Sequence, residues 1–352
     1  ACTISSTQGK KMPNEEWEYI IRSFRQLGGI AENVELREGQ FGRGVFTSNS
    51  ERKSTIMTPK NVLIKRKNAE LNEGKITIKP DPSTSKEARE FAEYYYNQLS
   101  WGKGGNSDSQ SFLKQITSLS TPIKNALARH RFIDKRLLNY KDNMETLLER
   151  FIDERAFQFK GESVLVPMLE LVNHSNYSPP FRVTQNGLET PPGNTKSPEL
   201  LHKYSGKNSP MSLWRSYGFT AVSIVAYSIP FEIKINQSSI LFRCFGQQEA
   251  AKDETNLRQA NAHLVSIDSF PVGCQSPNLP LTHLISTLSH ARINLDTAKS
   301  LMRFIQTLNI NTREQILNDL QTQKELKEIE LSKALKYEIE LIKASLMATE
   351  AP

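Results

Sequence analysis

A short stretch in the middle of the chain ends an apolar run with groups that can do chemistry. The stretch LVPMLELVNHSNYSPP, from Leu165 to Pro180, contains Glu170 and then Asn173, His174 and Ser175. A carboxylate, an amide and an imidazole can act as acid, base, hydrogen-bonding group or metal ligand. No second His or Cys follows at zinc-ligand spacing, and Ser175 lacks the glycines of a Gly-x-Ser-x-Gly elbow. Taken alone, His174 is also well explained as a structural histidine.

A pair of glycines forms the second candidate, in FGRGVF, where Gly42 and Gly44 flank Arg43. Glycine has no Cβ, so the backbone here can approach a ligand closely. The simpler interpretation is a turn or a bulge. The motif is not a dinucleotide fingerprint, because no third glycine follows at the required spacing and no helix pattern begins there.

Tyrosines form the third candidate, in ELLHKYSGKNSPMSLWRSYGF, which contains Tyr204, Tyr217 and Phe219. A single tyrosine usually fills a core or an interface. The order of the three motifs is more informative than any one of them.

The elements that must position these motifs alternate between strand and helix patterns. NEEWEYIIRSFRQLGG predicts a helix with Trp17, Ile20, Ile21 and Phe24 on one face, ended by glycine. Short β-branched runs separated by turn residues follow, up to about residue 80. A helical period, with a looser loop at SWGKGGNSDSQ, then extends from residue 86 to about residue 159.

Strand character returns at SVLVPML and again at SIVAYSIPFEIKINQSSILFRCF, and FRVTQNGLE between them is compatible with a hairpin. From about Pro280 onward the pattern is helical. Leu331, Leu335, Ile342 and Leu346 form one apolar stripe near the end of the chain. A β domain interrupted by helices and followed by a helical region is the predicted architecture.

Bulk composition narrows the class of protein. A chain of 352 residues predicts two or three subdomains. The net charge of +7 is spread along the chain, with one tight basic cluster, IKRKN, so no nucleic-acid partner is expected. No apolar run is long enough to span a membrane. Three cysteines without metal-ligand spacing favour a reducing, cytoplasmic setting, with an organellar or nuclear one left open. The first dozen residues show no presequence pattern and are expected to form a tail.

Together the motifs resemble the SET-domain methyltransferases, and within them the Rubisco large-subunit methyltransferase subfamily. FGRGVFTSNS is similar to the opening glycine motif of that family. SFLKQITSLSTP and LLERFIDERAFQF resemble elements of its helical insertion. LVPMLELVNHS is similar to its LVPxxDxxNHS, and KYSGKNSPMSLWRSYGF to its SYGxxSNxxLLxxYGF. The resemblance covers roughly Val34 to Leu346.

The resemblance implies an α+β fold, in which a SET-domain β fold is split by a helical insertion and followed by an all-helical substrate-binding domain. The expected division is a tail and helix at 1–30, the first SET part at 31–85, the insertion at 86–150, the catalytic core at 151–235 and the C-terminal domain at 236–352. The implied activity is transfer of a methyl group from S-adenosylmethionine to a lysine of a protein substrate. Histidine methylation and a catalytically silent scaffold that binds a partner stay open as alternatives, and the oligomeric state is open too.

The resemblance also implies roles for individual residues. Tyr204 is the catalytic tyrosine. The cofactor would be held by Gly42, Arg43, Gly44, Asn173, His174 and Phe219. The substrate amine would meet Glu154, Arg155 and Glu170 through their main-chain carbonyls, with Tyr217 nearby.

Methyl transfer to an amine requires the nitrogen, the methyl carbon and the sulfur in line, so most of the acceleration should come from positioning. A lysine amine is a nucleophile only when neutral, and its ordinary pKa is about 10.4. A dry channel beside a positive sulfonium lowers that pKa by desolvation and like-charge repulsion. No metal and no acidic base are required.

Departures from the family pattern are confined to a few positions. Glu170 replaces the usual Asp and Glu154 the usual Ser. KYSG replaces SYGP around Tyr204, and SPE replaces GEE just upstream. These changes leave the expected fold intact and concern the activity.

Overall fold

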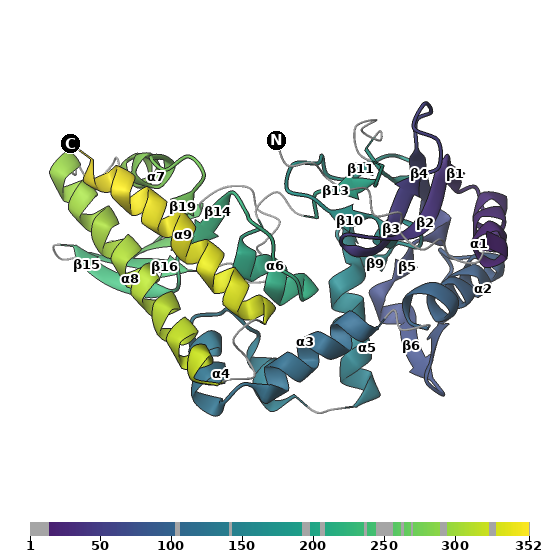
Figure 1. Cartoon of the computed structure of the whole chain (residues 1–352), viewed down its shortest axis with the longest axis horizontal. Coiled ribbons are helices and arrows are strands. Elements are labelled where there is room, and N and C mark those ends of the chain that lie inside the picture. The colour runs from purple at the N-terminus through teal and green to yellow at the C-terminus, as the bar shows by residue number, and fades with distance from the viewer. Residues whose placement is uncertain are drawn as a thin grey trace. The chain divides into compact units, whose positions relative to one another are not determined.

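The chain forms two compact units, which are described separately (Figure 1). The first contains Ala1–Gln110 and Asp142–Tyr204, and the second contains Ser111–Lys141 and Ser205–Pro352. The computed structural model describes residues 14–102, 106–140, 143–191, 198–204, 208–235, 238–243, 256–261, 264–268, 270–288, 294–323 and 329–351. Both units mix helices and strands, which confirms the predicted α+β class. The five-part domain division stays a prediction.

Small sheets make up most of the first unit. A four-stranded antiparallel sheet has the order β1-β4-β12-β11, with bounds Ile30–Glu32, Thr55–Pro59, Gly187–Glu189 and Arg182–Val183. A three-stranded sheet has the order β5-β9-β8, with bounds Ile64–Lys65, Glu162–Leu165 and Ala156–Phe159. Two hairpins are β2–β3, Val34–Gly39 with Gly42–Thr47, and β6–β7, Ala69–Asn72 with Lys75–Ile78. The β11–β12 pair confirms the hairpin expected at FRVTQNGLE.

One parallel pair joins two of the motifs from the sequence. Strand β10 (Asn173–His174) lies beside β13 (Leu201–His202), with Asn173 opposite Leu201 and His174 opposite His202. Two residues make a short strand, so side-chain contacts must fix its register. The segment before it contains the 3₁₀ turn η5, Leu169–Leu171.

Helices cover the sheets of the first unit. Helix α1 (Asn14–Gln26) buries the predicted face, since Ile20 and Phe24 are fully buried, and this confirms the helix expected there. The Phe24 ring stacks on Phe91 of α2 (Lys86–Tyr95) at 5.8 Å. Helix α2 continues into the π-helical turn η3, Tyr96–Ser100, and α5 spans Met144–Arg155. The short turns η1 and η2 span Lys60–Val62 and Arg66–Asn68, whereas the turn η4, Lys135–Asn139, belongs to the second unit.

The strands of the second unit form two sheets. One has the order β15-β16-β18-β17, with bounds Phe231–Ile235, Ser238–Arg243, Leu264–Asp268 and Asn256–Asn261. The other pairs β14 (Val225–Tyr227) with β19 (Pro271–Cys274). The region after residue 236 is therefore mixed rather than all-helical, because β16 to β19 precede its helices. Cys274 is a buried free thiol, whereas Cys2 and Cys244 lie outside the described residues.

The remaining helices also lie in the second unit, apart from α3 (Ser107–Ser118), which spans the division between the units. They are α4 (Thr121–Arg129), α6 (Pro210–Tyr217), α7 (Leu279–Thr287), α8 (Leu295–Thr322) and α9 (Glu330–Glu350). Helices α8 and α9 lie side by side (Figure 1). The predicted stripe on α9 is confirmed: Leu331, Leu335 and Ile342 are fully buried, and Leu346 packs against the core. Within the described residues, no helix is long and apolar enough to cross a membrane.

A buried ion pair lies within this helical layer. Arg313 Nη2 of α8 lies 2.7 Å from Glu338 Oε2 of α9, and both side chains are 1% exposed. The amide oxygen of Asn309 accepts from Arg313 at 2.8 Å, and Glu338 accepts from the main-chain N–H of Met211 at 3.0 Å. These hydrogen bonds satisfy charges that would otherwise be costly to bury.

Candidate functional site

Gly44 lies where three segments of the first unit meet. The Asn173 amide nitrogen donates to the Arg43 carbonyl at 3.3 Å and to Glu199 Oε1 at 2.7 Å. A Cβ added to Gly44 would lie 2.5 Å from that Glu199 oxygen and 2.6 Å from the Asn173 nitrogen. A side chain at position 44 would therefore force the ends of Glu199 and Asn173 to shift, so the sequence motif reflects close approach of the backbone to polar groups. Gly42 has φ +83° beside the β2–β3 turn, where glycine is favoured for a different reason.

The predicted tyrosine lies next to the Asn-His strand. The Tyr204 hydroxyl donates to the Val172 carbonyl at 3.3 Å, and its main-chain N–H donates to His174 Nδ1 at 3.2 Å. The rings of Tyr204 and His174 pack edge to face with centroids 5.0 Å apart. Two segments thirty residues apart in the sequence are therefore adjacent, as the resemblance implies.

These contacts fix the protonation of His174. Its Nδ1 accepts a hydrogen bond, so Nε2 carries the proton and donates to the Asn176 side-chain oxygen at 3.0 Å. Burial lowers the pKa of His174, and the nearby charge of Lys203 lowers it further. His174 is therefore a neutral side chain that connects the turn at Asn176 to the backbone of Tyr204.

His202 is a neighbour of Tyr204 that the motifs did not identify. Its ring stacks on Phe181 with centroids 3.4 Å apart and lies 4.6 Å from the Tyr204 ring. The side chain is buried, and its Nδ1 has no hydrogen-bond partner among the described residues. Burial lowers the pKa of His202 to about 3. The imidazole thus acts as a neutral, flat packing surface for the tyrosine.

This depressed pKa predicts an acid-sensitive fold. The pKa of His202 is 6.5 in the unfolded chain and about 3 in the folded one, so the unfolded chain binds the extra proton between these values. Stability should therefore fall as the pH drops below 6.5, by about 2 kcal/mol at pH 5 from this residue alone. Urea unfolding of wild type and His202→Phe at pH 7 and pH 5 measures this loss. His202→Phe should lose clearly less stability than wild type between pH 7 and pH 5. Equal losses in the two proteins would contradict the lowered pKa of His202.

The predicted substrate-side residues form one charged cluster. Arg155 Nη1 lies 3.3 Å from Glu154 Oε2, and Arg155 Nε lies 3.4 Å from Glu170 Oε2. Arg150 Nε also pairs with Glu154 Oε1 at 2.6 Å, and Ser109 donates to that carboxylate. The Arg155 guanidinium lies over the Phe151 ring at 4.0 Å. One arginine therefore connects the carboxylates that replace the Ser and the Asp of the family pattern.

Glu170 is the most enclosed member of this cluster, with its side chain 1% exposed. Its Oε1 accepts from the Tyr95 hydroxyl at 3.0 Å and from the Ser100 hydroxyl. Burial raises the pKa of the Glu170 carboxyl, against the lowering effect of Arg155. Burial also raises the pKa of Tyr95, and the charge of Glu170 adds to this effect. Glu170 is therefore held by its side chain and by its main-chain N–H, which donates to the Val166 carbonyl at 3.2 Å. Its main-chain carbonyl is the group proposed to meet a ligand.

The main chain around these residues is also specialised. Glu154 and Arg155 are the last residues of α5, where carbonyl groups have no intrahelical donor. Met168, just before η5, is buried with φ +72°, a conformation that costs free energy for a bulky residue. Such strain persists where the surrounding structure over-determines the backbone, and it is frequent at functional sites.

Tyr217 and Phe219 belong to the second unit. Tyr217 ends α6, and Gly218 follows it in the left-handed conformation, donating its N–H to the Trp214 carbonyl at 2.9 Å. The rings of Tyr217 and Phe219 have centroids 6.1 Å apart. Burial raises the pKa of Tyr217 to about 12. The structure therefore places nine of the eleven predicted residues in one unit, and the roles of all eleven stay predictions.

Sequence reasoning missed four residues of this site: Tyr95, Ser100, Glu199 and His202. Glu199 lies in the SPE departure just upstream of Tyr204, so the sequence did contain a signal for it. Tyr95 and Ser100 lie at the end of α2 and in η3, where an apolar helical pattern gives no indication of a polar partner seventy residues away.

Comparison with known proteins gives structural neighbours only. No protein-family model matches the chain, and no curated protein matches it. The chain is similar to the SET domain of LSMT solved with lysine and AdoHcy, at 15% identity and a TM-score of 0.44, over 96% of this chain and 92% of that one. It is also similar to Rubisco LSMT solved with sinefungin and monomethyllysine, at 14% identity and a TM-score of 0.46, with the same coverage.

Proposed function

We propose that the chain is an S-adenosylmethionine-dependent methyltransferase that acts on a lysine side chain of a protein substrate. The observation that carries this proposal is the convergence of Gly44, Asn173 and Tyr204 in one unit. Asn173 donates to the carbonyl of a residue 130 positions away in the chain, and Tyr204, two residues after the neighbouring strand β13, packs against His174 in the same region. The motif resemblance implies that these three residues share one site.

The residues present fit the methyl donor. A backbone without a side chain at Gly44 adjoins the Asn173 amide and the Glu199 carboxylate, so the polar part of a cofactor can meet main-chain and side-chain hydrogen-bonding groups. In the proposed assignment, Arg43 and Gly44 hold its methionine part, and Asn173 and His174 its adenosine part. When bound, S-adenosylmethionine supplies an electrophilic methyl group on a sulfonium.

The chain's own groups would orient the amine and keep water out. The Tyr204 hydroxyl points to the Val172 carbonyl, two residues beyond Glu170, and so lies by the segment proposed to face the amine. The carbonyls of Glu154 and Arg155 lie at the end of α5, where acceptors are available for the amine protons. Oriented acceptors would direct the nitrogen lone pair toward the methyl group, which is catalysis by positioning.

The buried carboxylate does not need to act as a base. Glu170 is held by Arg155, Tyr95 and Ser100, and its side chain is enclosed. In this proposal the lysine loses its proton to solvent as it enters the site, because the positive sulfonium and the dry channel both lower the amine pKa there. The activity should therefore increase with pH as the neutral amine becomes more abundant.

The test is transfer of an isotopically labelled methyl group. The chain is incubated with labelled S-adenosylmethionine and a cell lysate, and modified peptides are mapped by mass spectrometry. Label on lysine is the expected result. Label on histidine would show that the acceptor is a histidine instead of a lysine, while the chain would still be a protein methyltransferase. An absence of label, with donor binding intact, would favour a silent scaffold.

A further inference from the structure

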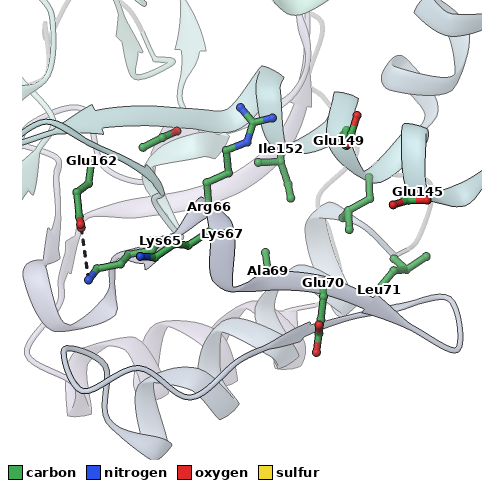
Figure 2. Close-up of a pocket in the computed structure, with 12 residues that line it drawn as sticks. Lys65, Arg66, Lys67, Ala69, Glu70, Leu71, Glu145, Glu149, Ile152 and Glu162 are labelled. Atoms are coloured by element: carbon green, nitrogen blue, oxygen red, sulfur yellow. Dashed lines mark ion pairs between the residues drawn. The ribbon is translucent and has the colours of Figure 1, made fainter. Parts of the chain in front are cut away.

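A cleft lies in the first unit, between β6 and α5, with a volume of about 820 Å³ (Figure 2). We call it the α5–β6 cleft and use six of its lining residues: Lys65, Lys67, Leu71, Glu145, Leu148 and Glu149. None of them belongs to the site described above. The volume lies within the range of pockets that hold small ligands or short peptide segments.

Basic residues at one end of the cleft are largely neutralised. Lys65 Nζ lies 3.5 Å from Asp81 Oδ2 and 3.6 Å from Glu162 Oε2. Arg66, next in the chain, pairs with Asp153. Of the IKRKN cluster, Lys67 alone is exposed and without an ion pair among the described residues. This cluster therefore offers little positive charge to a polyanion.

Carboxylates at the other end are unpaired. Glu145 and Glu149 lie four residues apart on α5, both are exposed, and neither makes an ion pair or hydrogen bond within the described part of the chain. Residues at this spacing share one helix face, so the two charges repel each other. Figure 2 places them on the side of the cleft away from Lys65 and Lys67. A cation bound there would relieve the repulsion.

The surface between these ends is apolar. Leu71 of β6 is half-buried, and Leu148 and Ile152 of α5 are buried beneath the cleft. An aliphatic side chain of a ligand can therefore remove apolar surface from water beside two carboxylates. The cleft thus combines an apolar floor with a rim that is negative at its α5 end, at Glu145 and Glu149.

We propose that the α5–β6 cleft binds a basic and apolar peptide segment, with an arginine or lysine on Glu145 and Glu149 and an aliphatic side chain on Leu71. Charge complementarity selects this occupant. A nucleic acid would place phosphates against the two carboxylates. The identification of this peptide as part of the methylated protein rests on the proposed function, whereas the binding itself does not.

The probe is a fluorescein-labelled peptide with two leucines flanked by arginines, titrated with the full chain and followed by fluorescence anisotropy without methyl donor. Two further probes replace the arginines by glutamates or the leucines by serines. We expect micromolar binding of the first probe and at least about tenfold weaker binding of the other two. Because no donor is present, failure of this experiment is distinct from failure of the methyltransferase proposal.

Charge reversal at both carboxylates, Glu145→Lys with Glu149→Lys, should weaken the binding of the arginine-containing peptide at least about tenfold. The matched control is Glu18→Lys with Glu51→Lys, which makes the same change of charge at two exposed sites outside the cleft and should leave the affinity within about twofold. The proposal is wrong if the first probe fails to bind at about 1 mM, or if both double variants weaken it equally. Preferential binding of the glutamate probe or of a labelled DNA oligonucleotide would also overturn it.

Discussion

Replacing Tyr204 by phenylalanine is expected to reduce the rate of methyl transfer about 100-fold or more while leaving donor affinity within about twofold. The substitution removes one hydroxyl, which donates to the Val172 carbonyl at 3.3 Å. It keeps the ring, which packs on His174 and His202 at centroid distances of 5.0 and 4.6 Å. Loss of one preorganised hydrogen-bonding group at a reacting centre typically costs a factor of about 10² to 10³.

Single-turnover experiments with labelled S-adenosylmethionine measure the rate of methyl transfer by this variant. Calorimetric titration measures its affinity for the donor. Tyr177→Phe is the matched control, because Tyr177 lies in the same unit and is 79% exposed. It should retain the wild-type rate. If Tyr204→Phe also retained it, Tyr204 would not be the catalytic tyrosine.

Replacing Arg155 by methionine is expected to destabilise the fold by about 3–5 kcal/mol, the range for breaking a buried ion pair. The side chains of Glu154 and Glu170 are 5% and 1% exposed. Without Arg155, Glu170 keeps hydrogen bonds from Tyr95 and Ser100 but loses its ion pair. The double variant Arg155→Met with Glu170→Gln should recover part of the loss, because no unpaired charge is then buried at position 170.

The pH dependence of the Arg155 variant has a definite sign. Burial raises the pKa of Glu170 in the folded chain, and removal of Arg155 raises it further, because the main lowering charge is gone. In the folded state Glu170 then keeps a proton at pH values where it has lost that proton in the unfolded state. The contribution of Glu170 to the free energy of unfolding therefore decreases as the pH rises through its raised folded-state pKa. The Arg155 variant should therefore be relatively more unstable at pH 8 than at pH 5.

Urea unfolding at both pH values checks this prediction for Arg155→Met. Arg182→Met is the control, since Arg182 pairs with Glu189 at the surface and is 61% exposed. Exposed pairs contribute about 0–1 kcal/mol. If Arg155→Met lowered the free energy of unfolding no more than Arg182→Met does, the charged cluster around Arg155 would not stabilise the fold.

Local patterns predicted the parts of the fold that depend on nearby residues. The period of α1 and of α9 identified their buried faces, and Asn186-Gly187 identified a hairpin. No local pattern indicated that β10 would lie beside β13, and the family resemblance implied only that Asn173, His174 and Tyr204 share one site. The two-residue register of this pair is set by contacts such as the one between His174 and Tyr204.

Long-range pairing explains what the sequence did not reveal. Strand β16 lies in a segment whose pattern indicated a strand, but its parallel partner β18 was not predicted, because parallel strands depend on partners far along the chain. Glu170 was identified as a polar interruption, yet its partners Tyr95 and Ser100 were hidden within a helical run. The IKRKN cluster looked cationic in sequence, whereas Asp81, Glu162 and Asp153 neutralise most of it.

Calorimetric titration of the full chain with S-adenosylmethionine tests the central claim most directly. The account predicts one binding site for the donor, weakened at least about tenfold in Gly44→Ala, because the added methyl would meet Glu199 and Asn173. Thermal unfolding verifies that the variant folds. Gly74→Ala serves as a control for strain alone, since Gly74 has φ +77° and its added methyl meets no atom within 4 Å; this variant should lose stability but keep the donor affinity. A chain that takes up no donor, or a Gly44→Ala variant that binds it as tightly as wild type, would contradict the proposed site.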